Sequence, residues 1–364
     1  MKILIVTGAS GGHIFPALAL IESLKETNSE AQITLVLPKK NALGTVDCRG
    51  CRLRYISYSS LKLSLDFKNI RAIFEFFKTC LESIFIFFEF KPDIVAGFGS
   101  LASLPIMILS WGLEVKSLIH EQNVLCGRAN RFLARFADKI AVSFAETGKY
   151  LLAADRKKVT VTGNPLRIQM KRLDKKDALD FFGFKQGIFT VLVAGGSQGS
   201  YSINEYFLKA VLEIRDRSPL QVIHICGKKG RQMIEDFYRG LDISARVYDF
   251  LGEMQYAYSA AELIVSRCGA TTIAEIVSFR LPALLIPYPY AYRHQWHNAR
   301  VLEDKGAAIV IPEERLKQGD LAKELKKYAD DPSRLKALGL AFDAFRAPEA
   351  GRLLCDELLS LYQA

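Results

Sequence analysis

The sequence has little that would mark a secreted, membrane-spanning or fibrous protein. Its 364 residues contain no low-complexity run, and they contain no stretch of ~20 mostly apolar residues, which a membrane-spanning helix needs. The N-terminal run ILIVTGA is too short and too rich in glycine for the core of a signal peptide. Because half of the residues are hydrophobic, we expect a folded cytoplasmic protein with two domains of ordinary size.

Cysteine shows no framework of disulfides or metal ligands. The seven cysteines are odd in number and scattered along the chain. Cys48 and Cys51 form a CxxC pair, but neither a second pair nor a nearby histidine completes a zinc site. We therefore expect these two residues to be incidental thiols.

The balance of charge is basic, with a formal net charge of +10 and an isoelectric point near 9.1. This excess favours an anionic partner, which could be nucleic acid, an acidic membrane surface or a phosphorylated substrate. The sequence contains no RNA-binding signature and no zinc finger, and its lysines and arginines are spread along the chain. We therefore do not expect nucleic acid as a partner.

Short apolar runs bounded by glycine or proline alternate with longer stretches of helical period. This alternation is typical of an α/β protein with parallel, doubly wound sheets. The rhythm breaks at TGNPLR, after which it starts again at residue 189, so we place a domain boundary after residue 165. Each half is Rossmann-like, and ligands of such sheets bind at the carboxyl ends of the strands, which predicts a cleft between the halves. The predicted strands are residues 2–7, 33–37, 93–97, 116–120, 139–142, 159–162, 189–194, 221–226, 246–250, 263–266 and 283–287.

Each half opens with a strand, a glycine-rich turn and a helix. The turns read GASGGH, with glycines at 8, 11 and 12, and GGSQG, with glycines at 195, 196 and 199. Neither turn fits the GxGxxG dinucleotide fingerprint or the P-loop, which continues with GK[ST]. A tight corner needs no ligand, but a turn of this kind at the start of both halves favours phosphate binding at helix N-termini.

The segment SRCGATTIAEI, residues 266–276, is the densest candidate site. Gly269 to Thr272 would form the start of a helix, whose N–H groups and dipole suit a diphosphate. Glu275 follows one turn later, where a carboxylate can bind the hydroxyls of a ribose. The pattern from Thr272 to Glu275 is also that of a capping box, which needs no ligand, and the spacing alone favours neither interpretation.

Seven segments, in order, resemble the motifs of the MurG family, the bacterial lipid I N-acetylglucosaminyltransferases. They are GASGGHIFPALAL, HEQNVLCGRANRFLA, GNPLR, LVAGGSQGSYSIN, SRCGATTIAEI, LPALLIPYPYAYRHQWHNA and LEDKGAA. The resemblance implies a two-domain glycosyltransferase of GT-B architecture. It also implies transfer of N-acetylglucosamine from UDP-N-acetylglucosamine to the C4 hydroxyl of the muramoyl sugar of lipid I, with inversion, to give lipid II.

The resemblance also assigns roles to parts of the chain. Residues 1–165 would bind the acceptor and the membrane, residues 166–341 would bind the UDP-sugar, and a C-terminal helix within residues 342–364 would pack back on the first domain. Within the donor site, the resemblance implies that Leu251 lies beside the uracil and that Glu275 binds the ribose. The diphosphate would be bound by Ala270, Thr271 and Thr272. Arg267 would contact a phosphate or the sugar, Gln295 would bind the sugar hydroxyls, and the residues that close around the donor would be Ser197, Arg167 and Asn123. The N–H groups of Ser10, Gly11 and Gly12 would meet the acceptor diphosphate or the edge of the donor.

Inversion requires a base that removes the proton of the attacking hydroxyl. His13, directly after the first glycine turn, is the first candidate, because imidazole titrates near neutral pH. His120 and Glu121, in HEQN, are the alternatives. The departing UDP could be stabilised electrostatically by the helix N-terminus at 270–272. No DxD-like motif accompanies these segments, so we expect neither a metal ion nor another cofactor.

The polyprenyl tail of the implied acceptor requires contact with a membrane. Residues 69–90 are rich in Ile and Phe but are interrupted by charges, so they predict a helix that is mostly buried against the sheet. The phenylalanines at 85, 87, 88 and 90, with Lys62, Lys68, Arg71 and Lys78 nearby, also suit an interfacial patch on an anionic leaflet. We expect peripheral attachment to the cytoplasmic face of the cell membrane, together with contacts to other cell-wall synthesis proteins.

Three segments depart from the family pattern. GAS stands for the usual GGT in the first turn, GFGSLASLP stands for GGYVSGP, and His294 stands for a common glutamine beside Gln295. Two other functions remain open: a related enzyme such as a UDP-N-acetylglucosamine 2-epimerase or another lipid glycosyltransferase, and a catalytically silent nucleotide-binding or membrane scaffold protein.

Overall fold

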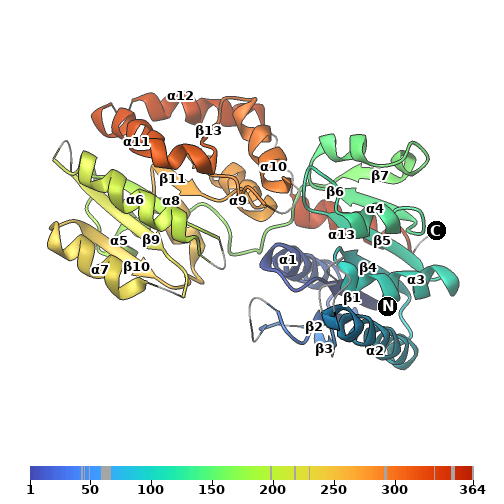
Figure 1. Cartoon of the computed structure of the whole chain (residues 1–364). Coiled ribbons are helices and arrows are strands. Elements are labelled where there is room, and N and C mark those ends of the chain that lie inside the picture. Colours follow the sequence, from blue (N-terminus) through green and yellow to red (C-terminus); the bar gives the residue numbers. More distant parts are fainter. Residues whose placement is uncertain are drawn as a thin grey trace. The chain divides into compact units, whose positions relative to one another are not determined.

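The computed structural model divides the chain into two compact units (Figure 1). Unit 1 comprises Met1–Ile168 and Pro348–Ala364, and unit 2 comprises Gln169–Ala347. The structure describes residues 1–41, 44, 46–48, 50–58, 67–196, 199–216, 219–228, 230–290, 293–331, 333–345 and 349–362, with the side chains of 67–73 left out. Because the chain returns to unit 1 at its end, both described ends belong to that unit.

Unit 1 contains a parallel sheet of seven strands in the order β3-β2-β1-β4-β5-β6-β7. Successive residues of a strand face opposite sides of a sheet, and in β1 Ile3 and Ile5 face one core while Leu4 and Val6 face the other. The first core is covered by α1 and α13, and the second by α2, α3 and α4. The strands are β1 (Lys2–Thr7), β2 (Gln32–Pro38), β3 (Arg52–Ile56), β4 (Ile94–Phe98), β5 (Lys116–Glu121), β6 (Lys139–Val142) and β7 (Val159–Val161), and the helices are α1 (Gly11–Thr27), α2 (Phe67–Phe90), α3 (Leu104–Gly112), α4 (Arg128–Leu133) and α13 (Ala350–Leu359), with short 3-10 turns η1 (Leu101–Ser103), η2 (Ala145–Tyr150) and η3 (Asp155–Lys158).

Unit 2 repeats this plan with a parallel sheet of six strands in the order β10-β9-β8-β11-β12-β13. In both sheets the strand order reverses direction next to the first strand of the unit, which is where ligands of doubly wound sheets bind. The strands are β8 (Phe189–Ala194), β9 (Leu220–Ile225), β10 (Ser244–Tyr248), β11 (Leu263–Ser266), β12 (Ala283–Leu285) and β13 (Ala308–Val310), and the helices are α5 (Lys175–Phe182), α6 (Tyr201–Ile214), α7 (Arg231–Gly240), α8 (Met254–Ala260), α9 (Ala270–Phe279), α10 (His294–Glu303), α11 (Asp320–Asp330) and α12 (Arg334–Leu340), with η4 (Glu313–Gln318) and η5 (Ala341–Ala344).

The two doubly wound parallel sheets confirm the predicted fold class. Two strands were missed. β3 reads RLRYI, in which charged residues alternate with apolar ones at the edge of the sheet, and β13 has only three residues. β10 begins and ends two residues earlier than expected, at Ser244 and Tyr248.

The C-terminal segment is shared between the units. Leu354, Cys355 and Leu358 of α13 pack in the same core as α1, and Glu357 pairs with Lys139 at 2.6 Å. The residues before α13 belong to unit 2, since Asp343 pairs with Arg280 and Ala344 O accepts a hydrogen bond from Lys305 Nζ at 3.3 Å. Residues 342–345, which we expected to pack with the first domain, therefore lie with the second unit.

The CxxC pair differs from the expectation of free thiols, because Cys48 and Cys51 form a disulfide. Their Cα atoms lie 5.7 Å apart, a separation that a disulfide spans. The described residues contain no cluster of three or more His, Cys, Asp or Glu that could hold a metal ion. Among the helices of the described residues, none is both long and apolar enough to cross a membrane.

Candidate functional site

The first glycine turn leads from β1 into α1 at the carboxyl edge of the sheet. Ser10 caps the helix with extended dihedrals, and its carbonyl accepts hydrogen bonds from His13 N at 3.0 Å and Ile14 N at 3.1 Å. A helix makes no internal bonds to the N–H groups of its first turn. Glycine is needed at position 8, because a Cβ there would lie 2.6 Å from His13 Nδ1. The turn thus places a helix start at the carboxyl edge of the sheet, and the binding of an anion there stays a prediction.

His13 is the third residue of α1, and its Nδ1 lies 2.9 Å from Ser10 Oγ. When Nδ1–H donates to Ser10, the other ring nitrogen, Nε2, is left as an acceptor, which is the state that a general base needs. Burial lowers the pKa of His13, while the negative charge of Glu121 acts to raise it. The lowered pKa keeps the imidazole neutral at neutral pH.

His120, an alternative base, is fully buried at the end of β5. Its Nε2 donates to Gly163 O at 3.0 Å, and its Nδ1 accepts from Gln122 Nε2 at 3.1 Å. Burial lowers the pKa of His120 to about 4. Both ring nitrogens of His120 already have protein partners, so we withdraw His120 as a candidate base. Its hydrogen bond to Gly163 instead holds the segment that follows β7.

Glu121, the other alternative, is 3% exposed, and its carboxylate accepts hydrogen bonds from several N–H groups. Oε1 accepts from Asn123 N at 3.0 Å and Asn123 Nδ2 at 3.3 Å, and Oε2 accepts from Gly127 N at 3.0 Å and Asn130 Nδ2 at 2.9 Å. Glu121 therefore holds the loop of residues 122–130 and supplies negative charge to His13. This arrangement argues against Glu121 as the base.

Asn130 is a residue that the sequence reasoning missed. It is 2% exposed, and its Nδ2 donates to His120 O at 3.0 Å as well as to Glu121. Its Oδ1 has no partner among the described residues. A Cβ built on Gly99 would lie 3.6 Å from this oxygen and 3.5 Å from His13 Nε2, so both atoms border the same glycine. The signal was its place in the segment HEQNVLCGRANRFLA, nine residues after Glu121.

Arg167 and Asn123 are fixed within unit 1. The guanidinium of Arg167 stacks 4.8 Å from the ring centroid of Phe15, and the next residue, Ile168, donates its N–H to Glu22 Oε2 at 2.8 Å. Asn123 is tied to Glu121 and also accepts from Thr147 Oγ1 through its carbonyl at 3.0 Å. Their predicted contacts with the donor stay predictions, and Ser197 lies outside the described residues.

In unit 2, helix α9 begins at Ala270 with Gly269 as its N-cap. Its first backbone bond runs from Ile273 N to Gly269 O at 2.9 Å. Thr272 therefore lies within the first turn and does not cap the helix, so the capping-box interpretation is wrong. A glycine cap has no side chain to approach the first N–H groups, which suits a helix start that binds an anion.

Glu275 is held from the side by a buried tyrosine. Tyr258 Oη donates to Glu275 Oε2 at 2.7 Å, and the tyrosine ring stacks on Phe279 with centroids 5.1 Å apart. Burial and the Glu275 charge raise the pKa of Tyr258, which therefore stays protonated and donating. The carboxylate is thus oriented one turn into α9, where the predicted ribose contact requires it.

Arg267 differs from its prediction as a direct contact to phosphate or sugar. It is 8% exposed, and it pairs with Glu313. Its Nη2 donates to Ser200 Oγ at 2.8 Å and Ser202 Oγ at 3.0 Å, and its Nη1 donates to Ile286 O at 3.3 Å. Both terminal nitrogens are occupied by the protein. Arg267 therefore joins the start of α6, after the second glycine turn, to the end of β12.

Gln295 and Leu251 also have structural contacts. Gln295 Oε1 accepts from Cys268 N at 3.1 Å and Tyr288 N at 3.0 Å, whereas its Nε2 has no partner among the described residues. Leu251 is buried at 6% exposure, but the neighbouring Phe250 is 57% exposed. The exposed apolar surface at this place is thus the ring of Phe250, which the sequence reasoning did not single out, and the predicted contact of Leu251 with the uracil stays a prediction.

Helix α2 exposes a continuous apolar face, which we call the α2 stripe. Its residues recur at helical spacing and are 39–74% exposed: Phe74, Phe77, Leu81, Ile84, Phe85 and Phe88. Phe87, which we had expected on the patch, is only 3% exposed, and Phe90 is half-buried. Lys78 is exposed, whereas Lys62 and the side chains of Lys68 and Arg71 lie outside the described residues. The helix is therefore less buried than predicted.

The fold consists of two parallel-sheet units, and the family models that match both of them define a glycosyltransferase. Residues 3–142 match the glycosyltransferase family 28 N-terminal domain, and residues 190–351 match the family 28 C-terminal domain. The chain belongs to the family of the UDP-N-acetylglucosamine--N-acetylmuramyl-(pentapeptide) pyrophosphoryl-undecaprenol N-acetylglucosamine transferases, the MurG family.

The relatives on which this rests match along their whole length. The chain is 35% identical over 365 residues to the transferase of that name from Listeria monocytogenes serovar 1/2a, covering 99% of each. It is 34% identical over 365 residues to that of Halothermothrix orenii, covering 98% of each. The crystal structure of Acinetobacter baumannii MurG matches with a TM-score of 0.75 at 24% identity, over 99% of this chain and 100% of that one. A Neisseria meningitidis UDP-GlcNAc 2-epimerase bound to UDP-GlcNAc matches with a TM-score of 0.67 at 14% identity, over 99% and 100% of the two chains, which shows a shared fold.

Proposed function

We propose that this protein transfers N-acetylglucosamine from UDP-N-acetylglucosamine to the C4 hydroxyl of the muramoyl sugar of lipid I, and so forms lipid II with inversion. The observation that carries the proposal is His13, a neutral imidazole held by Ser10 at a helix start that can bind a diphosphate. Family membership supports the substrates, because the curated relatives carry this reaction in their names.

In the proposed step, the C4 oxygen of the acceptor forms a bond to the anomeric carbon while the bond from that carbon to the UDP oxygen breaks. His13 Nε2 takes the proton of the C4 hydroxyl, and the imidazolium later releases it to water. The buried charge of Glu121 stabilises the imidazolium as it forms, since it raises the pKa of His13. Asn130 keeps Glu121 in position through its hydrogen bonds to Glu121 Oε2 and His120 O.

The donor is assigned to unit 2. The start of α9, Ala270 to Thr272, would bind the diphosphate and stabilise the charge on the departing UDP. Glu275, oriented by Tyr258, would accept from the ribose hydroxyls. Gln295 Nε2 would donate to the sugar, and Phe250 would stack on the uracil. The acceptor diphosphate would lie at Ser10, Gly11 and Gly12.

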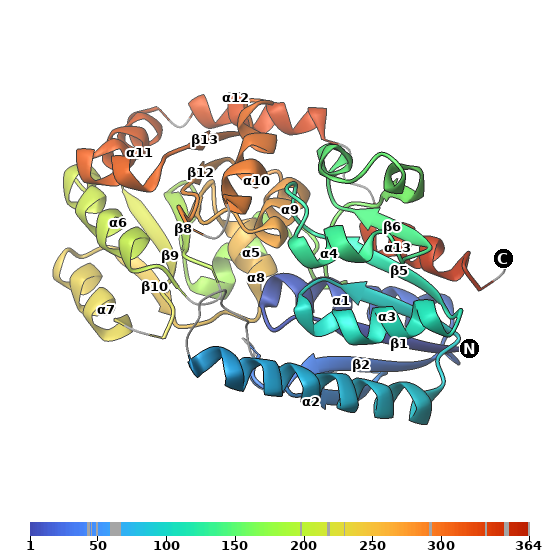
Figure 2. The ribbon, with the colours of Figure 1, turned by 45° about the vertical axis from the view of Figure 1, so that its right-hand side comes forward.

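We further propose that the protein attaches to an anionic membrane surface through the α2 stripe. Large exposed apolar patches on a protein mark interaction sites, and the helix α3, which contacts α2, also exposes Ile108 and Trp111 (Figure 2). Lys78 lies among the stripe residues and would meet lipid phosphates. Contacts with other cell-wall synthesis proteins stay a prediction.

The test is incubation with labelled UDP-N-acetylglucosamine and a lipid I analogue, followed by isolation of the lipid-linked product. The proposal predicts a disaccharide whose new linkage is β, as shown by its anomeric coupling in NMR. Conversion of the nucleotide sugar without an acceptor would instead indicate an epimerase. Binding of the nucleotide with no conversion of either substrate would indicate a scaffold protein.

A further inference from the structure

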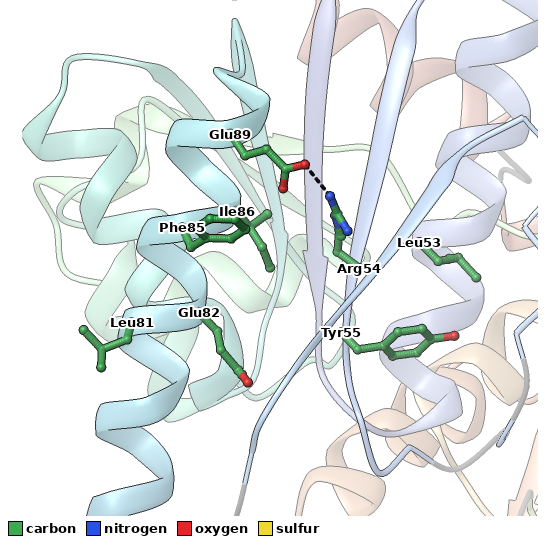
Figure 3. A pocket seen from close by; sticks show the side chains of 8 residues that line it. All are labelled: Leu53, Arg54, Tyr55, Leu81, Glu82, Phe85, Ile86 and Glu89. Atoms are coloured by element: carbon green, nitrogen blue, oxygen red, sulfur yellow. Dashed lines mark hydrogen bonds and ion pairs between the residues drawn. The ribbon is translucent and has the colours of Figure 1, made fainter.

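A groove runs between α2 and the edge strand β3 in unit 1 (Figure 3). We call it the α2–β3 groove, and its volume is about 450 Å³, within the ~300–1,000 Å³ range of small-molecule sites. Phe85 and Ile86 line it from the helix, and Arg54 lines it from the strand, whereas the ring of Tyr55 is turned away from α2. Ile86 is 5% exposed, so the bottom of the groove reaches the core of the unit.

The two ends of the groove differ. At one end Glu89 pairs with Arg54, and also with Arg52 at 3.2 Å, so that an ion pair connects the helix to the strand across the groove. At the other end Glu82 accepts from Ser57 Oγ at 3.1 Å and from Lys39 Nζ at 2.8 Å. Ser57 directly follows β3, so this second end lies at the carboxyl edge of the sheet.

That same edge carries the first glycine turn. β1 and β2 are paired with Val6 opposite Val36, and β2 and β3 with Pro38 opposite Ile56. Neighbouring strands lie ~4.8 Å apart, so the second end of the groove lies about 10 Å, two strand spacings, from the turn. Lys39 and Lys40 follow β2, between the turn and the groove, and both are exposed. Along the carboxyl edge of the sheet, the N–H groups of the first glycine turn are therefore followed by Lys39 and Lys40, and these by the α2–β3 groove.

The groove also continues into the α2 stripe. Leu81 and Phe85 line the groove and are themselves 53% and 68% exposed on the stripe. A chain that leaves the bilayer at the stripe would enter the groove without crossing polar surface. The sequence of groups along this edge matches a molecule with a long apolar chain joined to a diphosphate.

We propose that the α2–β3 groove binds the isoprene units nearest the diphosphate of the acceptor's polyprenyl chain, and that Lys39 and Lys40 contact that diphosphate together with the N–H groups of Ser10, Gly11 and Gly12. This assignment rests on the proposed function, which makes a polyprenyl diphosphate sugar the acceptor. The acyl chain of a bilayer phospholipid is the competing occupant. The acceptor chain fits better, because its doubly charged diphosphate complements the two adjacent lysines that follow β2. Lys39 also pairs with Glu82 at this end of the groove, and Lys40 adds a second positive charge beside it.

The test is photo-crosslinking of the full chain in detergent. The probe is a polyprenyl diphosphate with a diazirine on its second isoprene unit, and the labelled residues are mapped by mass spectrometry. We expect the label on Leu81 or Phe85. Leu81→Lys places a charge in the groove and should reduce this labelling about tenfold, since the loss of one apolar contact changes binding by about that factor.

Phe88→Lys is the matched control. Phe88 is 55% exposed on the same stripe, against 53% for Leu81, but it does not line the groove. Both variants should lower binding to anionic vesicles equally, whereas only Leu81→Lys should lose the label. Equal loss of label in both variants would overturn the proposal. So would labelling of the groove by a phospholipid with the same diazirine on its acyl chain when the polyprenyl probe labels elsewhere.

This labelling requires no sugar transfer, so it separates the two hypotheses. If the groove is labelled but no sugar is transferred, the proposed function is refuted and the assignment of the groove to the polyprenyl chain stands. Sugar transfer with labelling outside the groove would refute the groove alone. Polyprenol of the same length, which lacks the diphosphate, should label less, and equal labelling would contradict the assignment of Lys39 and Lys40.

Discussion

Two buried histidines should make the protein lose stability in mild acid. His120 in unit 1 and His224 in unit 2 are both 0% exposed, and burial lowers the pKa of His120 to about 4 and that of His224 to about 3. In the unfolded chain a histidine titrates near about 6.5. Between these values the unfolded state binds a proton that the folded state does not, so stability falls as the pH falls below about 6.5.

The magnitude follows from the shift. At pH 5 each histidine contributes a loss of about 2 kcal/mol, because the unfolded pKa lies about 1.5 units above that pH and one unit is worth about 1.4 kcal/mol. The loss would reach about 5 kcal/mol for His224 below pH 3. Its ring is enclosed by a chain of hydrogen bonds, with Nδ1 2.8 Å from Tyr238 Oη and Nε2 3.1 Å from Asn204 Oδ1. A protonated ring cannot accept from the tyrosine.

The assay is urea unfolding of the full chain at pH 7 and pH 5, with wild type and His224→Gln compared at both. Glutamine removes the titrating group but can both donate and accept. We expect the difference in unfolding free energy between the two pH values to shrink by about 2 kcal/mol in the variant. An unchanged difference would refute the assignment of a neutral, buried His224.

Three further predictions concern the candidate sites. Tyr258→Phe should raise the KM for the donor several-fold with little change in kcat, because it removes the group that orients Glu275; an unchanged KM would contradict the ribose assignment. Arg267→Ala should lower the unfolding free energy of unit 2 by about 2 kcal/mol, since it leaves Ser200 and Glu313 without their shared partner. Urea unfolding curves that match those of wild type would show that these contacts of Arg267 do not stabilise the unit. Phe77→Ser should weaken binding to anionic vesicles about tenfold, because Phe77 is 61% exposed on the α2 stripe. Lys326→Ser, on α11 of unit 2, serves as the control. Equal losses of vesicle binding in both variants would show that the α2 stripe is not the membrane-binding surface.

The fold was largely predictable because its signals are local. Continuous apolar runs such as those of β1 and β8 belong to strands that are buried on both faces, and a glycine turn follows each. The strand β3 was not predictable in this way. It lies at the sheet edge, so only part of its surface is buried, and its charged residues obscure the apolar ones.

The site was predictable as a set of segments but not as a set of roles. The candidate motifs contain His120, Glu121 and Arg267, but in the structure all three are buried and hydrogen-bonded to other polar groups of the protein. Whether a polar side chain faces a substrate or the protein depends on contacts with residues far away in the chain, such as Gly163 for His120 and Glu313 for Arg267. Phe250 and Asn130 were missed for the same reason, since their exposure and burial arise only in the folded chain.

The central claim is that His13 removes the proton of the acceptor hydroxyl. The most direct measurement is the rate of lipid-linked disaccharide formation by His13→Ala at saturating donor and acceptor, beside a measurement of UDP-N-acetylglucosamine affinity. We expect kcat to fall ~10²–10⁴-fold, with donor affinity unchanged because the proposed donor contacts lie on unit 2. A variant that retains kcat within a few-fold of wild type would contradict the account.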